Sequence, residues 1–421
     1  MDQGNTAFLL IAAALVLLMT PGLAFFYGGL VKAKSVISMM MMSFGAIGLI
    51  GVLWAIYGYA IAFPGAEGTI FPWSIDTGAI FLSNLLEVPE GAAYPPLAFV
   101  AFQATFAIIT VALVSGAIAD RAKFGAWMVF AGVWATIVYF PVASWVFNFG
   151  LAEDGSFAYG GWLTHGLQDV FGLGTIDFAG GTAVHINAGA AALALALVLG
   201  KRVGFAKGAH VPHNPPFVLL GAGLLWFGWF GFNAGSELAA DGTAALAFVN
   251  TIIAPAAALL AWLVVEKIKD GKPTSIGAAS GAVAGLVAIT PACASLTPGW
   301  AMLLGVLAGV ICALAIDLKF KLGFDDSLDV VGIHLIGGLV GTLYLGFFAT
   351  GTGLFFSGSG TQLLVQAIAA FSVLVYSFVL AFVIGFIIEK TMGFRVKNED
   401  EVAGIDLVVH GEEGYVLADA K

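Results

Sequence analysis

The sequence has little charge. Only 10% of its 421 residues are Asp, Glu, Lys or Arg, whereas 60% are hydrophobic, well above the roughly 45–50% apolar content of soluble domains. Apolar runs long enough to cross a bilayer as helices, about 20 residues each, recur along nearly the whole chain. The composition therefore excludes an ordinary soluble domain and predicts an integral membrane protein with short connections.

The sequence also has few cysteines and little of the alternation between hydrophobic and polar residues that is typical of β-strands. Cys293 falls near a predicted helix end and Cys312 inside a predicted span, which excludes a disulfide framework. Runs such as AIAAFSVLVYSFVLAFVIGFII lack the inside/outside alternation of a membrane barrel, so the spans are predicted to be helices. The start, MDQGNTAFLL, has no basic segment, and the first apolar run is expected to be a retained span rather than a cleaved signal.

The apolar runs and their breakers predict eleven membrane spans in one transmembrane domain, 1–389, followed by a cytoplasmic tail, 390–421. The predicted spans are 7–30, 36–62, 97–119, 125–147, 178–199, 217–236, 244–266, 275–292, 300–317, 330–350 and 362–389. All 16 Lys and Arg residues follow odd-numbered spans, and basic residues accumulate in cytoplasmic loops. The N-terminus is therefore predicted outside and the C-terminus inside. The long external loops are acidic, which is typical of a cation-attracting mouth or of ordinary solvated surface.

Two histidines lie in matching contexts. His185 comes eight residues after Asp177, His334 comes eight residues after Asp326, and a glycine follows four residues beyond each histidine. The two spans run in opposite directions in the predicted topology, as an inverted repeat of five plus five helices requires, and this predicts that the histidines meet near the midplane. Asp177, at the external end of its span, is expected to cap the helix, to supply negative potential, or both.

The chemistry of such a pair has three interpretations. Ionisable residues at membrane depth are costly and usually face a cavity, a pathway or one another. Burial disfavours the imidazolium form, so we expect neutral rings that share one N–H and could bind a small polar solute or relay a proton. The alternatives are two satisfied packing histidines and a metal site, although two histidines without a third ligand make a poor zinc set.

Aromatic residues cluster near the predicted external ends of two spans. FQATF places Phe102 and Phe106 on one helix face, and WFGWFGFNAGS places Trp229, Phe232 and Ser236 at helical spacings. The ordinary interpretation of phenylalanine in a membrane helix is lipid contact or packing. The functional interpretation is an entrance at which ring faces hold a cation, worth roughly 0.5–2 kcal/mol each.

Together these motifs resemble the ammonium transporter (Amt/Rh) family, most closely its Amt branch. The similarity covers nearly the whole chain and lies in TPGLAFFYGGLV (20–31), FQATFAIITVALVSGAIADR (102–121), DFAGGTAVHINAG (177–189), WFGWFGFNAGS (226–236), ITPACA (289–294) and DDSLDVVGIHLIGG (325–338). The resemblance implies an all-α bundle of eleven transmembrane helices with an inverted five-plus-five repeat. It also implies one pore per subunit of a homotrimer in the plasma membrane.

The resemblance also implies residue roles. It places Phe106, Phe147, Trp229 and Ser236 at an external recruitment site, Phe106 and Phe232 at a gate, His185 and His334 in the pore, and Asp177, Thr290 and Phe102 in supporting positions. Many relatives have tryptophan where this chain has Phe147. Because a phenyl ring offers a weaker cation–π face and no N–H donor, we expect weaker ammonium binding here.

The expected function is transmembrane transport of ammonium or ammonia, with ammonium deprotonated outside, ammonia conducted past the histidines, and the proton either released or carried separately. No enzyme activity, cofactor or metal is expected. One alternative is an ammonium sensor, for which we expect an appended signalling domain, whereas only residues 390–421 follow the last span. The other is a membrane metalloenzyme.

The tail raises a separate question. Its polar, glycine-punctuated composition predicts disorder, whereas GIDL and HGEEGY resemble the Amt tail that packs against the base of the subunit. By the same resemblance, a PII-type signalling protein is the expected partner at this face, and nucleic acid is not.

Overall fold

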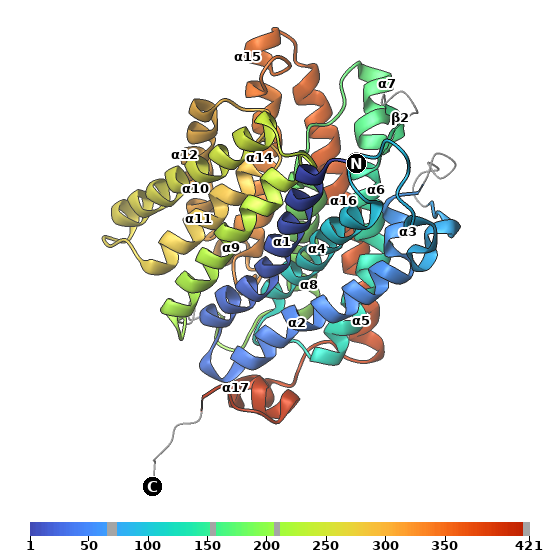
Figure 1. Cartoon of the computed structure of the whole chain (residues 1–421). Helices are drawn as coiled ribbons and strands as arrows, with labels where there is room; N and C mark the ends of the chain where they lie inside the picture. Colours follow the sequence, from blue (N-terminus) through green and yellow to red (C-terminus); the bar gives the residue numbers. More distant parts are fainter. Residues whose placement is uncertain (65–73, 152–156, 206–210, 416–421) are drawn as a thin grey trace.

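The computed structural model describes residues 1–64, 74–151, 157–205 and 211–415. Figure 1 shows a bundle of long helices in which the N-terminus lies in the half that carries α7 (Leu167–Phe171) and β2 (Phe157–Gly160), with α17 (Asn398–Ala403) at the opposite end. The start of α1 and the tail helix α17 therefore lie at opposite ends of the bundle, which is the arrangement that an odd number of membrane crossings produces.

Long apolar helices make up the bundle. In the first half of the chain they are α1 (Gln3–Leu30); η1 (Ala33–Ser35), α2 (Val36–Leu53), η2 (Trp54–Gly58) and α3 (Tyr59–Ala62); α4 (Pro96–Val114) and η5 (Ser115–Ile118); α5 (Phe124–Trp134), η6 (Ala135–Tyr139) and α6 (Phe140–Phe147); η8 (Gly181–Ile186) and α8 (Asn187–Leu199). In the second half they are α9 (Pro215–Gly235); α10 (Gly242–Lys269); α11 (Ser275–Ile289); α12 (Pro298–Ala315) and α13 (Leu318–Leu322); η10 (Val331–Leu335) and α14 (Ile336–Phe348); and α16 (Thr361–Thr391).

Ten of these helical stretches, within the described ranges, are long and apolar enough to cross a membrane. The shorter helix α11 occupies the predicted span 275–292. The predicted class, an all-helical integral membrane protein, is confirmed. The division into eleven crossings, their direction and the inverted repeat stay predictions.

Local sequence explains where several helices begin. Asp241 accepts hydrogen bonds from the N–H groups of Thr243 and Ala244 at the start of α10, and Thr274 caps α11 in the same way. Proline occupies the first turn of α4, α9 and α12, where no backbone donor is lost. Glycine then allows close packing: a Cβ on Gly221 of α9 would lie 2.2 Å from the backbone nitrogen of Phe26 on α1.

Short elements cover the predicted external end. They are η4 (Thr77–Leu85), the antiparallel strands β1 (Phe149–Leu151) and β2, the π-helical turn η7 (Trp162–Gly166), α7 and α15 (Leu354–Ser357). The two strands were not predicted, because they are too short for an alternating pattern to be visible. Residues 65–73 and 152–156 of the predicted external loops lie outside the described residues.

The tail packs against the base of the bundle, as the Amt resemblance implied and contrary to the disorder that composition alone predicted. Asp406, in η11 (Asp406–His410), accepts hydrogen bonds from the backbone N–H groups of Ile37 (3.0 Å) and Ser38 (2.7 Å). Glu401 of α17 accepts one from the N–H of Val203 (2.6 Å). Composition did not reveal these contacts because each carboxylate finds its donors on a loop or helix end far away in the sequence.

Candidate functional site

Both predicted pore histidines lie on π-helical turns that open a helix. His185 is in η8, which continues into α8, and His334 is in η10, which continues into α14. π-Helical turns are rare and occur frequently at functional sites. The two matching contexts seen in the sequence are therefore also alike in local structure.

An aspartate caps each of these turns. The carboxylate of Asp177 accepts hydrogen bonds from the backbone N–H groups of Gly180 (2.9 Å), Thr182 (2.8 Å) and Ala183 (3.1 Å) and from the Thr182 hydroxyl. This confirms the predicted capping by Asp177. Asp326 caps η10 through the N–H of Val331 at 2.7 Å.

Glycines allow the two broken helices to cross in backbone contact. A Cβ on Gly189 of α8 would lie 2.5 Å from the backbone nitrogen of Leu335 in η10. A Cβ on Gly338 of α14 would lie 3.0 Å from the carbonyl oxygen of Gly181 in η8. This crossing brings the two histidine-bearing turns together in the interior of the bundle.

The histidine rings face each other. Nδ1 of His185 lies 3.2 Å from Nδ1 of His334, the ring centroids are 5.3 Å apart, and both side chains are buried. A hydrogen bond between two Nδ1 atoms requires one ring to donate and the other to accept. Nε2 of His185 is buried and has no hydrogen-bond partner in the described part of the chain, so it is free to bind a solute.

A narrow cavity surrounds the pair. The space in this cavity that is open to the centre of a water molecule is about 10 Å³. This is close to the minimum that holds one water molecule. Apart from the two imidazoles and one indole N–H, its lining is apolar: Met19, Leu23, Phe26, Ile109, Leu113, Val184, Leu225, Trp229, Phe232 and Val283. Only a small solute fits, and little besides the imidazoles can hydrogen-bond to it.

Stacked phenylalanines close the cavity on the predicted external side. The rings of Phe106 and Phe232 are nearly parallel with centroids 4.1 Å apart. Phe102 supports Phe106 at 4.9 Å, and Phe147 approaches Phe106 edge-on at 6.2 Å. The structure thus brings Phe102, Phe106, Phe147 and Phe232 together.

Trp229 lies deeper than the proposed recruitment site. It is three residues before Phe232 on α9, about 4.5 Å closer to the bundle centre along the helix, and its ring stacks on His185 with centroids 5.5 Å apart. Its Nε1–H donates to the hydroxyl of Thr290 at 2.8 Å. The Ser236 hydroxyl lies beyond the gate and donates to the carbonyl of Phe232 at 2.8 Å. Trp229 therefore forms part of the cavity wall and is held there by Thr290, whereas Phe147 and Ser236 lie on its external side.

The aliphatic part of the lining was not predicted, although a signal was present. Ile109 and Leu113 continue the face of Phe102 and Phe106 at spacings of three and four, and Leu225 precedes Trp229 by four residues. Extending each aromatic stripe by helical periodicity would have identified these residues.

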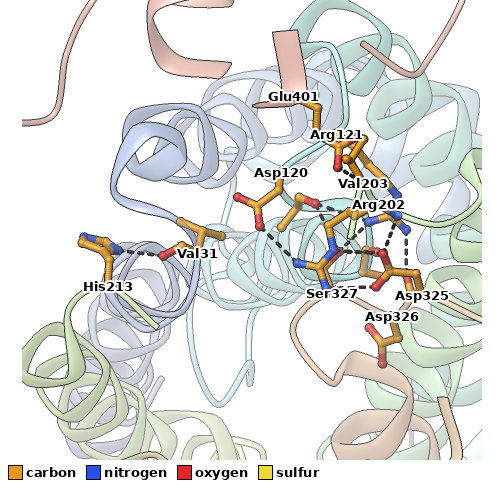
Figure 2. Close-up of polar contacts among 12 residues, drawn as sticks. Val31, Asp120, Arg121, Arg202, Val203, His213, Asp325, Asp326, Ser327 and Glu401 are labelled. Atoms are coloured by element: carbon orange, nitrogen blue, oxygen red, sulfur yellow. Dashed lines mark hydrogen bonds and ion pairs between the residues drawn. The ribbon is translucent and has the colours of Figure 1, made fainter. Parts of the chain in front are cut away.

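A buried charge cluster lies near the opposite end of the bundle, where the tail docks (Figure 2). The guanidinium of Arg202 bridges the carboxylates of Asp120 (3.1 Å) and Asp325 (2.9 Å). Burial raises the pKa of Asp325, but hydrogen bonds from Arg202 and its positive charge outweigh burial and hold this pKa below its usual value. Nearby, burial lowers the pKa of Arg121 to about 10, and Arg121 donates to the Asp325 carbonyl at 2.6 Å.

These features define a class: a multi-pass membrane protein with a narrow apolar lumen, two facing imidazoles inside it and a gate of two stacked rings. Among the described residues, no cluster of three His, Cys, Asp or Glu side chains suits a metal ion. The chain belongs to the Ammonium Transporter Family, whose sequence model matches residues 7–415.

Similar proteins agree over nearly the full length. An ammonium transporter from Mycobacterium tuberculosis is 54% identical over 444 residues, which cover 99% of this chain and 91% of that protein. Among solved structures, a sensor Amt protein matches with a TM-score of 0.87 at 28% identity, covering 97% of this chain and 98% of the other. Candida albicans Mep2 matches with a TM-score of 0.85 at 30% identity, covering 99% and 94%.

Proposed function

We propose that this protein transports ammonium across the plasma membrane by conducting ammonia through the lumen that contains His185 and His334. The observation that carries the proposal is the contact between these rings inside a cavity wide enough for about one water molecule. Family membership supports ammonium as the substrate and transport, rather than an enzymatic reaction, as the activity.

The lumen favours the neutral form of the substrate. A bare ammonium ion in this apolar cavity loses its hydration at a cost of several kcal/mol or more. Ammonia carries no charge, and its lone pair and N–H groups can bind the imidazole nitrogens in turn. The proposal therefore requires ammonium to lose its proton before it passes Phe106 and Phe232.

Recruitment occurs outside this gate. The rings of Phe106 and Phe147 meet at a steep angle on the predicted external side, and the Ser236 hydroxyl lies one turn beyond Phe232. Ring faces attract a cation and a hydroxyl oxygen accepts a hydrogen bond from it. We assign Trp229 to the inner side of the gate, where its ring orients His185.

The route of the proton can be measured. Purified protein in liposomes on a solid support is exposed to ammonium jumps, and the current is compared with that of a His185→Ala, His334→Ala double variant. If the histidines carry the proton, the wild type gives a current that the double variant lacks. A wild type that conducts ammonia without current excludes that route and leaves a neutral channel.

The same measurement separates transport from sensing. Flux through purified protein alone is the result expected of a transporter, whereas a sensor that signals through its cytoplasmic face would bind ammonium without comparable flux. The histidine-lined lumen favours transport, since recognition at the surface alone would not require a passage through the bundle.

We further propose a homotrimer and a PII-type partner at the predicted cytoplasmic face. The family resemblance supports both, and the docked tail supplies an ordered surface beside the charge cluster. The mass of the purified complex in detergent tests the trimer. Co-elution with a PII protein tests the partner.

A further inference from the structure

Helix α16 carries two buried amides that the mechanism above does not use. Gln362 and Gln366 are one helical turn apart on the same face and are 1% and 0% exposed. Polar side chains inside a membrane bundle are costly unless they are paired, and they usually serve a functional purpose. Moreover, α16 is the eleventh span and lies outside the predicted five-plus-five repeat.

Gln366 pairs with both backbone polar groups of a single residue, Ile176. Its Oε1 accepts a hydrogen bond from the N–H of Ile176 (2.8 Å), and its Nε2 donates to the carbonyl of the same residue (2.8 Å) and to that of Thr342 (3.1 Å). Gln362 donates to Oε1 of Gln366 (3.1 Å) and to the carbonyl of Gly174 (3.2 Å). The two amides thus fix residues 174–176, a segment with no helix or strand of its own.

This segment leads directly to the pore. Ile176 precedes Asp177, whose carboxylate caps η8, and η8 carries His185. A shift of Ile176 would move the cap and with it the first turn of the helix. An unbroken chain of hydrogen bonds and covalent bonds therefore connects Gln366 to the pore histidine.

The corresponding segment before His334 is held differently. Arg121 donates to the carbonyl of Asp325 (2.6 Å), and Lys319 donates to the carbonyl of Asp326 (3.1 Å). One approach to the lumen is therefore fixed by cations and the other by uncharged amides. Uncharged donors avoid placing positive charge on the side where we propose that ammonium enters.

We propose that Gln366, supported by Gln362, is a positioning residue that sets the place of His185 in the pore. Its loss leaves the backbone N–H and the backbone carbonyl of Ile176 without these partners in a buried site, so the segment rearranges to find others. The inference rests on the proposed function for its transport readout and is independent of it for its spectroscopic readout.

The test compares Gln366→Leu with Tyr376→Phe. Tyr376 is on the same helix and its hydroxyl donates to the carbonyl of Ile137 at 2.8 Å, so the control also removes a buried hydrogen bond but leaves residues 174–177 untouched. We expect Gln366→Leu to lower the ammonium-dependent current about tenfold and to shift the ¹⁵N ring resonance of His185, assigned with His185→Ala. Tyr376→Phe should leave both unchanged.

Gln366→Glu keeps the test decisive if the leucine variant fails to fold. A protonated carboxyl group provides one donor and one acceptor and can replace the amide toward Ile176, whereas a carboxylate cannot donate. At acidic pH, the current and the His185 resonance of Gln366→Glu should match those of wild type measured at the same pH. As pH rises, both should depart from the wild-type values. Wild-type resonance and current in a folded Gln366→Leu, or at every pH in Gln366→Glu, overturn the inference. A wild type that shows neither ammonium current nor ammonia uptake refutes the proposed function, while the resonance still decides the role of Gln366.

Discussion

The family resemblance leads us to expect tryptophan at the position of Phe147, and the structure places Phe147 beside the gate. It is 5% exposed and directs its edge toward Phe106 from the end of α6. Phe147→Trp enlarges the aromatic face and adds an N–H donor. We expect the half-saturation concentration for ammonium to fall about threefold, in line with about 0.5–1 kcal/mol for a cation–π contact.

Initial uptake rates in proteoliposomes measure this change. Phe227→Trp is the control, because Phe227 is 55% exposed on the outer surface of α9. An unchanged half-saturation concentration in Phe147→Trp would show that this position does not contact the cation.

Glu237 gives the external site a dependence on pH. It follows Ser236 just past the end of α9, and burial together with the nearby Asp241 raises the pKa of Glu237 to about 7. Above that pH the carboxylate attracts ammonium, and below it the group is neutral. We expect the half-saturation concentration to rise as external pH falls through about 7, by about two- to fivefold for a partly screened charge.

Glu237→Gln removes this charge at every pH. The variant should show the weaker binding throughout and lose the step near pH 7, whereas Asp169→Asn, at an exposed position on α7, should keep the step. If the change in half-saturation concentration near pH 7 persists in Glu237→Gln, a group other than Glu237 causes it.

At the scale of elements, the crossing of α8 with η10 leaves no room for a larger side chain. Since a Cβ on Gly189 would lie 2.5 Å from the backbone nitrogen of Leu335, Gly189→Ala must push η10 away and separate His334 from His185. We expect transport to fall at least tenfold and stability to fall by about 1–3 kcal/mol, the usual cost of overpacking.

Gly223→Ala is the matched control, because a Cβ there meets no atom within 4 Å. It should transport at the wild-type rate and melt at or above the wild-type temperature. Uptake and thermal unfolding in detergent measure both variants. Wild-type uptake by Gly189→Ala would mean that the histidine contact tolerates a displaced helix.

The sequence predicts an element well where the element has a local pattern of residues, and poorly where it depends on contacts with distant parts of the chain. Span five was visible because its run of small apolar residues is long, and His185 was visible because it interrupts that run. The π-helical form of η8 left no pattern in the sequence. The depth of Trp229 was missed because a one-dimensional spacing does not state on which side of the gate a ring lies.

At the scale of the whole molecule, the buried charges near the tail join segments that are distant in the sequence. Asp120, Arg202 and Asp325 come from three different connections and meet in one cluster. Glu401 of the tail accepts a hydrogen bond from Val203, the residue after Arg202. The cluster therefore couples the ends of several spans to the docked tail.

Asp325→Asn tests how much of the stability of the molecule depends on this cluster. The variant leaves the buried Arg202 with one carboxylate instead of two, and breaking a buried ion pair typically costs about 3–5 kcal/mol. The control is Asp317→Asn, which breaks the half-exposed pair with Lys269 and should cost under about 1 kcal/mol. Thermal unfolding in detergent, followed with the tail intact, compares the two.

The same pair predicts an acid-dependent loss of stability. The pKa of Asp325 in the folded protein lies below its usual value of 3.8, so the folded state binds fewer protons than the unfolded state in this range. Its contribution is complete above about 3.8 and is lost as pH falls toward the lower folded value. Wild type should therefore lose melting temperature below that pH more steeply than Asp325→Asn, which has no carboxyl group to protonate. If melting temperature falls equally steeply with pH in the two proteins, other groups cause the acid sensitivity. The pair of Arg202 and Asp325 then does not contribute to it.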